Sequence, residues 1–421
     1  MKISLKSILN KKRLALIHAV LFAAGMLILA SGCQSSEERL IAKADKIHNR
    51  VLTLDSHVDT PLLLFREEFN IGQRNDPHQR GGKLDFPRMK EGGLDAAFFA
   101  VFVGQGARTS EGYEVAKNRA LTLFDMIHQA IEAHPDQARL ALTPDDACRI
   151  RAAGKRAIYI GVENGYPLGD DVTVLQTFYD LGGRYLGLSH TRNNQLCDSS
   201  TDPEGEEHGG LTDFGREVVK ELNRLGMMVD VTHISDQSFY DVLDVSRAPV
   251  IASHSNARAI CDHPRNLDDN MLRALAKNGG VIQLCILSAY VKTMEPDPKR
   301  DSAFADLRQR YNNFEDLSDE EMDNARREWS ELDELFPRSL ATVADLVDHV
   351  DHVVNLIGID HVGIGTDFDG GGALADCFDV TELGNITREL VRRGYSEEDI
   401  DKIWSGNFMR VFREVEAMAG S

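Results

Sequence analysis

The chain has 421 residues, of which 42% are hydrophobic, and a formal net charge of −20. A net negative charge this large argues against nucleic acid and against an anionic membrane surface as binding partners. The length is sufficient for one large domain with insertions or for two domains, and the hydrophobic content supports a substantial core.

The first segment, residues 1–32, has the features of a bacterial lipoprotein signal peptide. Basic residues between Lys2 and Arg13 precede an apolar run over 14–30, and small residues stand directly before Cys33. This pattern resembles the lipobox, in which cleavage leaves the cysteine as a lipidated N-terminus; an ordinary signal peptide or an uncleaved anchor helix is the alternative. Removing residues 1–32 takes away five positive charges and no negative ones, so the net charge changes from −20 to −25.

Lipidation at Cys33 predicts a protein of the cell envelope, anchored to the membrane on its periplasmic or extracellular side. Several acyl chains would anchor it stably, since a single chain binds a membrane only marginally. Residues 33–44 are then interpreted as a polar tether, and residues 45–421 as a single domain.

From residue 51 onward, apolar β-like runs alternate with amphipathic helical stretches, the pattern of a parallel α/β sheet. The predicted strands are 51–59, 93–103, 156–162, 184–189, 227–232, 249–253, 280–286 and 361–366, and the clearest helices are 113–133, 212–225, 268–277 and 340–357. Eight strands suffice for a TIM-like (β/α)8 barrel. An open doubly wound sheet is the alternative, but it would gather its site at one crevice, whereas the candidate ligands here follow strands all along the chain. We therefore predict the barrel.

One stretch, residues 290–338, interrupts this alternation. It is highly charged and poor in β-branched residues, and it includes the helical sequence NARREWSELDEL. We interpret it as a solvated helical insertion between strands 7 and 8. Because the loop leaves the C-terminal face of the barrel, part of a lid or a subunit contact is the alternative.

Five cysteines follow Cys33. They are odd in number and show no CxxC spacing: Cys148, Cys197, Cys261, Cys285 and Cys377. Buried free thiols are the expected state, with one or two disulfides as the alternative in an oxidising compartment.

Candidate metal ligands stand at the ends of the strand-like runs. They are His57 with Asp59, then Glu163, His190, His233, His254 and Asp367. The carboxyl ends of barrel strands meet at one face, where enzymes of this fold carry their chemistry. Imidazoles mixed with carboxylates, with no thiolate among them, are typical of a hydrolytic metal centre. The pattern predicts a metallohydrolase.

The spacing of these residues suggests two metal ions. His57 and Asp59 are two apart and can reach one ion, His233 and His254 can serve another, and the two oxygens of Glu163 can bridge them. Two cations about 3.5–4 Å apart would hold a bridging hydroxide and polarise a carbonyl group. By contrast, His349 and His352 are helically spaced beside acidic residues, and we interpret them as part of a solvated helix face.

Several motifs resemble those of the membrane (renal-type) dipeptidases, which are binuclear zinc peptidases with an amidohydrolase-like barrel. The motifs are LDSHVDTP, GVENG, YLGLSHTRNN, GLTDFGREVVKELNRLGMMVDVTHIS, VIASHSNARAICDHPRN and HVGIGTDFDG, and the resemblance spans roughly residues 45–415. The first-strand pair is His-x-Asp, where most related hydrolases have His-x-His, so the resemblance is specific.

This resemblance implies two Zn²⁺ per chain, one on His57 and Asp59, the other on His233 and His254, with Glu163 bridging. It further implies that His190 contacts the substrate and stabilises the oxyanion, and that Asp367 transfers a proton from water to the leaving amine. Arg265 matches the arginine that pairs with the C-terminal carboxylate of the substrate. A surface charge on the loop after strand 6 is the alternative for Arg265.

The implied activity is hydrolysis of dipeptides with a free C-terminal carboxylate, both L-L and L-D. A related barrel metallohydrolase acting on lactams, lactones or N-acyl amino acids is the first alternative, and a binding lipoprotein built on an inactive barrel is the second. Asn164 and the segment 191–197 depart from the family pattern and leave the side-chain preference open. Cobalt or manganese could replace zinc in such a site. The resemblance also allows a homodimer.

Overall fold

The computed structural model describes residues 35–420 except 80, 315–316 and 338. The predicted signal peptide, residues 1–32, and the predicted lipidation site Cys33 lie outside the described residues. Within the described part of the chain, no helix is long and apolar enough to span a membrane.

The sheet is a parallel barrel, as predicted. Its strands are β1 (Leu54–Val58), β2 (Ala96–Phe102), β3 (Ala138–Leu140), β4 (Arg156–Glu163), β5 (Gly183–Gly187), β6 (Met228–Asp230), β7 (Ile251–Ser255), β8 (Val281–Leu284) and β9 (Val362–Ile364). The order around the barrel is β1-β2-β4-β5-β6-β7-β8-β9. The ring closes where Val58 pairs with Phe368 beyond β9. All eight predicted strands are present; β3, a three-residue strand that pairs with β4 outside the ring, was not predicted.

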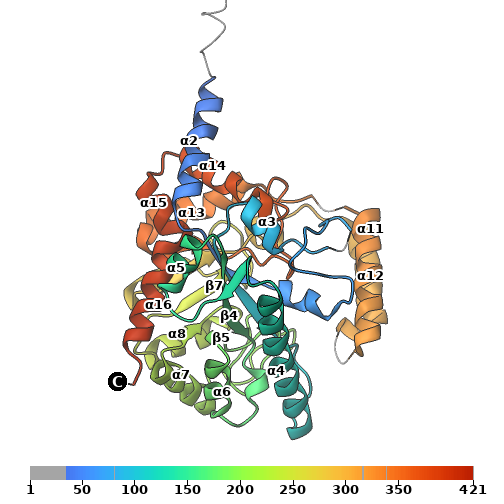
Figure 1. Cartoon of the computed structure of the whole chain (residues 1–421). Helices are drawn as coiled ribbons and strands as arrows, with labels where there is room; N and C mark the ends of the chain where they lie inside the picture. The colour runs from blue at the N-terminus through green and yellow to red at the C-terminus, as the bar shows by residue number, and fades with distance from the viewer. Residues whose placement is uncertain (1–34, 80, 315–316, 338, 421) are drawn as a thin grey trace, which may run out of the picture.

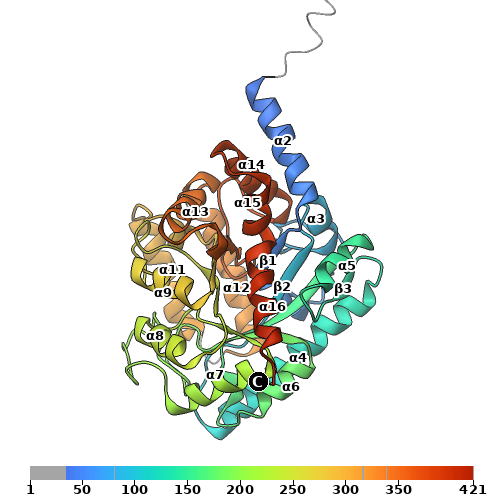
Figure 2. The same cartoon turned by 90° about the vertical axis from the view of Figure 1, so that its left-hand side faces the viewer.

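Helices surround the barrel in Figures 1 and 2. They are α2 (Ser36–Arg50), α3 (Phe86–Glu91), α4 (Ser110–Ala133), α5 (Asp146–Ala152), α6 (Val174–Asp180), α7 (Asp213–Leu225), α8 (Asp236–Val245), α9 (Asp269–Asn278), α10 (Ser288–Val291), α11 (Pro298–Arg310), α12 (Asp319–Leu335), α13 (Val343–Ile357), α14 (Gly384–Arg392), α15 (Glu397–Asp401) and α16 (Asn407–Ala417). The predicted helices begin and end at capping residues. Thr212 and Asp268 accept hydrogen bonds from the first turns of α7 and α9, and Gly226 and Gly279 end these helices in the left-handed conformation.

Aromatic rings fill the interior of the barrel below the ends of the strands. The Phe98 ring lies 4.8 Å from that of Tyr159, 5.4 Å from that of Tyr185 and 5.1 Å from that of Phe408 on α16. We call this cluster, with Phe412, the floor of the barrel. Because it is buried and closely packed, the open end of the barrel lies at the carboxyl ends of the strands, which we call the mouth.

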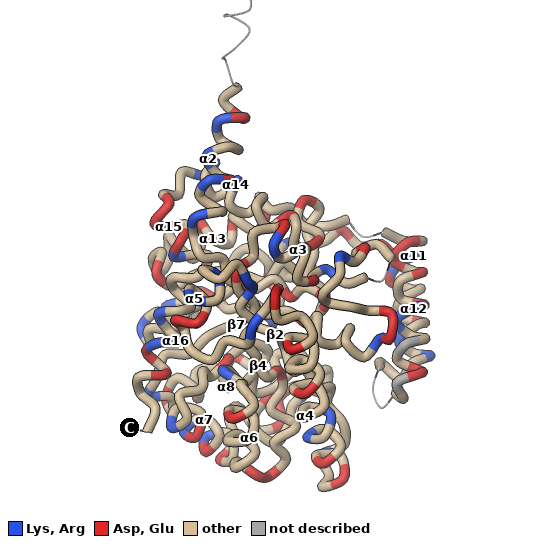
Figure 3. Tube along the Cα trace, viewed as in Figure 1, with Lys and Arg blue, Asp and Glu red and all other residues tan. Residues whose placement is uncertain are grey.

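The insertion between β8 and β9 is helical, as predicted. Its helices α11 and α12 pack on each other through aromatic rings, with Phe304 4.6 Å from Trp329. In Figure 1 they stand to one side of the barrel, and Figure 3 shows that both helices carry charges of both signs.

The segment expected to be a polar tether is helical from Ser36 on. Ser35 and Glu38 form a capping box that starts α2, a feature that the tether interpretation overlooked. Ala44, Ile47 and His48 are buried, whereas the first turn of α2 is exposed and projects beyond the body of the molecule in Figures 1 and 2.

The five described cysteines are free thiols. Four of them are buried as expected, but Cys148 on α5 is exposed, so the expectation of burial was wrong for this residue.

Candidate metal centre and active site

The predicted ligands gather at the mouth of the barrel around Glu163. The Oε2 atom of Glu163 lies 3.4 Å from Nε2 of His57, and Oε1 lies 3.0 Å from Nε2 of His233 and 3.6 Å from Nε2 of His254. Asp59 Oδ2 lies 3.6 Å from His57 Nε2. All five side chains are buried. The two oxygens of Glu163 are therefore divided between one group at the end of β1 and another at the ends of β6 and β7.

The backbone is irregular where it presents these side chains. The register shifts within β1 between Asp55 and Val58, and within β7 between Ala252 and Ser255, so both shifts flank a predicted ligand. Such irregularities re-aim side chains that strict alternation would turn outward.

Left-handed backbone conformations also cluster here. His233 has φ 73°, Asp367 has φ 60°, Asp369 has φ 67° and Asn164 has φ 76°. Non-glycine residues adopt this conformation at an energetic cost, and such residues concentrate at functional sites. The only other described examples lie in the insertion, at 312–314.

Neighbouring polar groups orient the imidazoles. His57 Nδ1 lies 2.8 Å from the Tyr185 hydroxyl, which donates to the Ser56 carbonyl at 3.2 Å. His254 Nδ1 lies 2.9 Å from the Ser253 hydroxyl, which donates to Asp230 Oδ2 at 2.6 Å. In each pair the hydroxyl proton is used elsewhere, so the hydroxyl oxygen accepts from Nδ1, and Nε2 is the ring nitrogen that faces Glu163.

This donor set fits metal ions. Nitrogen and oxygen ligands at about 2.0–2.2 Å from a tetrahedral ion are separated from each other by roughly 3.3–3.6 Å, which is close to the separations around Glu163. Among the described residues, His57 Nε2 and Asp59 Oδ1 are buried with no hydrogen-bond partner.

The charge states suit the same role. Burial lowers the pKa of His233 and His254 well below the ordinary range, with further lowering by Arg265 at His233, so both rings are in the neutral form that binds metal. Burial on its own raises the pKa of Glu163, but His57 and His233 outweigh it and hold this pKa well below its ordinary range.

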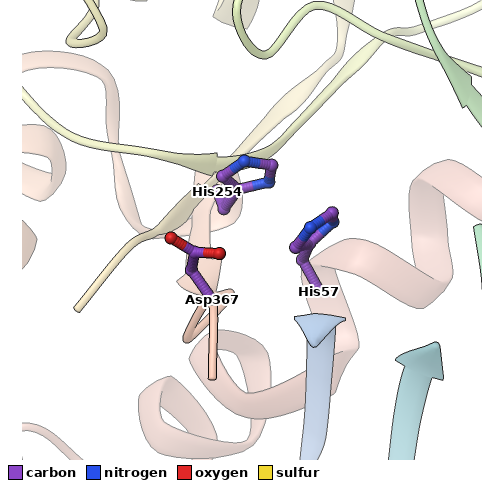
Figure 4. A group of neighbouring side chains, drawn as sticks. All are labelled: His57, His254 and Asp367. Atoms are coloured by element: carbon purple, nitrogen blue, oxygen red, sulfur yellow. The ribbon is translucent and has the colours of Figure 1, made fainter. Parts of the chain in front are cut away.

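Asp367 lies beside these ligands. Figure 4 shows His57, His254 and Asp367 pointing toward a common space, and their ligand atoms lie within 4.8 Å of one another. Burial raises the pKa of Asp367 well above its ordinary range, and the neighbouring Asp59 carboxylate raises it further. Asp367 therefore favours its protonated form more strongly than an exposed carboxyl group.

The two predicted substrate contacts also lie at the mouth. His190 Nε2 is 3.8 Å from Glu163 Oε1, and its ring stands 4.3 Å from that of His233. Arg265 is buried, donates to the His254 carbonyl at 3.1 Å and lies 5.2 Å from the Tyr290 ring. Its Nε has no partner among the described residues. Arg265 is thus not a surface charge, which excludes the alternative considered from the sequence.

A cavity of about 470 Å³ opens over this cluster. Besides the predicted residues, it is lined by side chains that the sequence did not reveal: Leu62, Phe102, Leu287, Tyr290 and Asp369. Asp369 could have been suspected, because it follows Asp367 by two residues in the same motif. The apolar residues carry no signal that separates a cavity wall from a core position.

The segments that depart from the family pattern are Asn164 and residues 191–197, and of these Thr191 lines the cavity. The Asn164 side chain donates to the Val103 carbonyl at 2.9 Å and accepts from the Tyr166 backbone at 3.1 Å, which holds its left-handed turn. Asn194 donates to Asn164 at 3.1 Å, so the two departures contact each other. Few residue types other than Gly, Asn and Asp adopt the left-handed backbone conformation of Asn164 readily.

His349 does not lie on a solvated helix face, so that interpretation was wrong. It is fully buried, accepts from the Ala257 backbone at 3.1 Å and contacts the Val291 carbonyl at 2.8 Å. The acidic neighbours in the sequence point elsewhere because the ring lies on the inner face of α13. His349 thereby ties the loop after β7 to α10. His352 is half-buried and pairs with Asp269 at 2.7 Å.

A family model described as membrane dipeptidase (peptidase family M19) matches residues 41–421. The chain belongs to the membrane dipeptidase family. Within that family it is 33% identical over 360 residues to dipeptidase tcpJ of Claviceps purpurea, a match that covers 84% of this chain and 74% of that protein.

Solved structures agree with the family. The probable dipeptidase PvdM from Pseudomonas aeruginosa is 31% identical with a TM-score of 0.76, covering 90% of this chain and 99% of that one. A metallopeptidase from Rhodobacter sphaeroides, solved with a phosphinate mimic of the dipeptide L-Ala-D-Ala, is 25% identical with a TM-score of 0.69, covering 87% and 99%. The resemblance seen in the motifs is confirmed, and the chain is a metallopeptidase of the dipeptidase family.

Proposed function

We propose that the chain is a dipeptidase that binds two zinc ions, with Glu163 as the bridging ligand. The observation that carries this proposal is the division of the Glu163 oxygens: Oε2 faces His57, and Oε1 faces His233 and His254. One ion would be held by His57, Asp59 and Glu163, and the other by His233, His254 and Glu163.

Zinc bound there would lower the pKa of a water molecule and polarise the scissile carbonyl group. His190 would donate a hydrogen bond to the oxyanion, and one preorganised donor of this kind lowers the barrier by about 3–4 kcal/mol. Asp367 would take the proton of the attacking water and deliver it to the leaving amine. Its raised pKa suits a group that must hold a proton during the reaction.

Arg265 would bind the C-terminal carboxylate of the substrate. The guanidinium is buried at the edge of the cavity, and its Nε is without a partner among the described residues. A planar guanidinium can bind a carboxylate through two parallel hydrogen bonds, which lysine cannot do. This contact would restrict the enzyme to peptides with a free carboxyl end.

The substrates we propose are L-L and L-D dipeptides. The Rhodobacter sphaeroides relative, with its bound mimic of L-Ala-D-Ala, supports the L-D class. Recovery of amino acids from scavenged short peptides is the simplest role for such an activity.

One experiment tests the metal and the carboxylate contact together. The purified chain is assayed with L-Ala-D-Ala, with L-Ala-L-Ala and with the C-terminal amide of each, before and after chelation and after addition of zinc. We expect cleavage of the free acids only, lost on chelation and restored by zinc.

Two results would contradict parts of this proposal. Equal cleavage of the amides would remove Arg265 from its role and favour the broader activity on lactams, lactones or N-acyl amino acids. Failure to cleave any dipeptide, in protein that contains two metals, would show that the substrate class is wrong.

We also propose that Cys33 is lipidated, that residues 45–421 act as one catalytic domain and that the protein lies in the cell envelope. The resemblance to a signal peptide with a lipobox supports this proposal, and the family resemblance is compatible with a homodimer. When cells are supplied with radiolabelled fatty acid, the wild-type protein should become labelled and the Cys33→Ser variant should not. Equal labelling of the two proteins would contradict lipidation at Cys33.

A further inference from the structure

Phe102 stands directly beside the proposed bridging ligand. Along β2, side chains alternate between the two faces of the strand, so Phe102 shares its face with Phe98, which belongs to the floor of the barrel. Phe102 is also the register partner of Glu163 on β4. Its ring therefore lies at the mouth, next to the position where the scissile peptide would be held.

Leu62 extends this apolar surface. It belongs to the short helix η1 (Thr60–Phe65), which follows β1 and packs beside β2. Both Leu62 and Phe102 are half-buried and line the cavity. The Phe102 ring meets His190 edge-on, with centroids 4.6 Å apart. We call Leu62 and Phe102 the β2 wall.

Arg265 lies on the opposite side of the mouth. It follows β7, and in the closed order β1-β2-β4-β5-β6-β7-β8-β9 the strands β2 and β7 are four steps apart in either direction. Glu163 is the last residue of β4 and His190 follows β5, so both lie between them. A substrate that has its carboxylate on Arg265 and its peptide bond over Glu163 must therefore extend toward the β2 wall.

We propose that the β2 wall binds the side chain of the N-terminal residue of the dipeptide and selects apolar residues there. This inference rests on the proposed function and names its substrate class. Neither Leu62 nor Phe102 has a side-chain polar group, so a polar or charged side chain placed against them would lose its water without a replacement hydrogen bond. An apolar side chain would instead bury carbon surface against the two side chains, as in most small-molecule pockets.

The test compares two substrate series with wild-type enzyme and with the F102A and L62A variants. In the first series the N-terminal residue of Xaa-Ala is Gly, Ala, Leu, Phe or Asp, and in the second the C-terminal residue of Ala-Xaa is varied in the same way. Wild type should cleave Leu-Ala and Phe-Ala with a kcat/KM about 10–100-fold above that for Gly-Ala, the range typical of an apolar pocket.

In F102A, kcat/KM for Leu-Ala and Phe-Ala should be no more than about threefold above that for Gly-Ala, and in L62A this ratio should fall by a smaller factor. The corresponding ratios in the Ala-Xaa series should stay unchanged in both variants. Ratios are compared because loss of the ring contact with His190 can lower the absolute rate for every substrate. F102L keeps the wall apolar without the ring and should retain most of the preference, which also covers the case in which F102A fails to fold.

Three results would overturn the inference. The first is a wild-type enzyme with no preference for an apolar N-terminal residue, and the second is a change confined to the Ala-Xaa series. The third is a ratio of kcat/KM for Leu-Ala or Phe-Ala to that for Gly-Ala that is unchanged in correctly folded F102A or, if F102A does not fold, in L62A. Failure of the proposed function looks different, because the wild-type enzyme would then cleave none of these dipeptides.

Discussion

The mouth and the floor of the barrel are built on the same strands but satisfy opposite requirements. In the floor, the rings of Phe98, Tyr159 and Phe412 are buried and closely packed. At the mouth, His57 Nε2 and Asp59 Oδ1 are buried without a hydrogen-bond partner among the described residues. Buried polar atoms without a hydrogen-bond partner lower the stability of the fold. The packing of the floor offsets this loss, so the polar groups of the mouth can remain organised for binding.

Tyr185 connects the two regions. Its ring packs against Phe98 in the floor, and its hydroxyl lies 2.8 Å from Nδ1 of His57 at the mouth. Gly161 makes room for this ring, since a Cβ atom there would lie 2.0 Å from the Tyr185 side chain. The orientation of a proposed ligand therefore depends on packing one layer below it.

The largest expected effect comes from replacing the central ligand of the mouth. Glu163→Gln should lower kcat/KM for L-Ala-D-Ala by at least about 1000-fold, because loss of one preorganised stabilising group already costs about 100–1000-fold. Zinc content per chain should fall as well. Glu331→Gln on the exposed face of α12 is the matched control and should keep both the kcat/KM and the zinc content of the wild type. An E163Q enzyme that is active and binds two metal ions would contradict the assignment of Glu163 as the central ligand of the mouth.

Phe98→Ala tests the floor. Removing a buried aromatic ring should lower the free energy of unfolding by about 3–5 kcal/mol, since a cavity remains where the ring packed. Urea unfolding of metal-free protein measures this change. Protein that remains folded should still bind zinc, and a destabilisation below about 1 kcal/mol would show that the floor does not carry the stability assigned to it.

Tyr185→Phe separates the contribution of the hydroxyl from that of the ring. The variant keeps the ring in the floor but removes the hydrogen-bond partner of His57 Nδ1, so zinc affinity should fall by about 10–100-fold. The free energy of unfolding without metal should change by no more than about 1 kcal/mol. Zinc titration against a competing chelator and urea unfolding give the two values. Unchanged affinity would mean that packing alone orients His57.

His48 on α2 is a buried histidine outside the mouth, with both ring nitrogens in contact with polar groups. Nδ1 lies 2.8 Å from the Thr387 hydroxyl and Nε2 lies 2.9 Å from the Gly92 carbonyl. Burial lowers its pKa. The unfolded chain therefore binds a proton at this position first, and the stability that neutral His48 contributes is lost as the pH falls below about 6.5.

His48→Gln should consequently cost more stability at about pH 8 than at about pH 5.5, and this is the smallest of the four effects. The free energies of unfolding of the two proteins, measured across this range, give the difference directly. Subtraction of one from the other cancels the titration of the histidines at the mouth. A difference in the free energy of unfolding between the two proteins that does not change with pH would show that His48 is not held neutral.

The sequence predicts the mouth better than its surroundings. Glu163, His233 and His254 could be found because each polar side chain follows an apolar strand, and strand ends converge in a barrel. Phe102 and Tyr290 could not, because an apolar residue at the mouth has the same sequence environment as one in the core. His349 was misjudged because its partners are backbone groups of distant segments, which leave no trace in its own sequence neighbourhood.

Helix α2 and strand β3 show two other limits. The polar composition of 33–44 suggested a tether, yet a capping box and a few buried contacts with the body suffice for a helix. Strand β3 has only three residues, too few for alternation to be visible, and its pairing with β4 determines its conformation.

The most direct test of the central claim is an anomalous difference map at the zinc edge from crystals of the zinc-loaded protein. We predict two peaks at the mouth, one about 2.0–2.2 Å from His57 Nε2 and Glu163 Oε2, the other equally close to Glu163 Oε1, His233 and His254. A single peak, or peaks that do not share Glu163, would contradict the bridged two-metal centre.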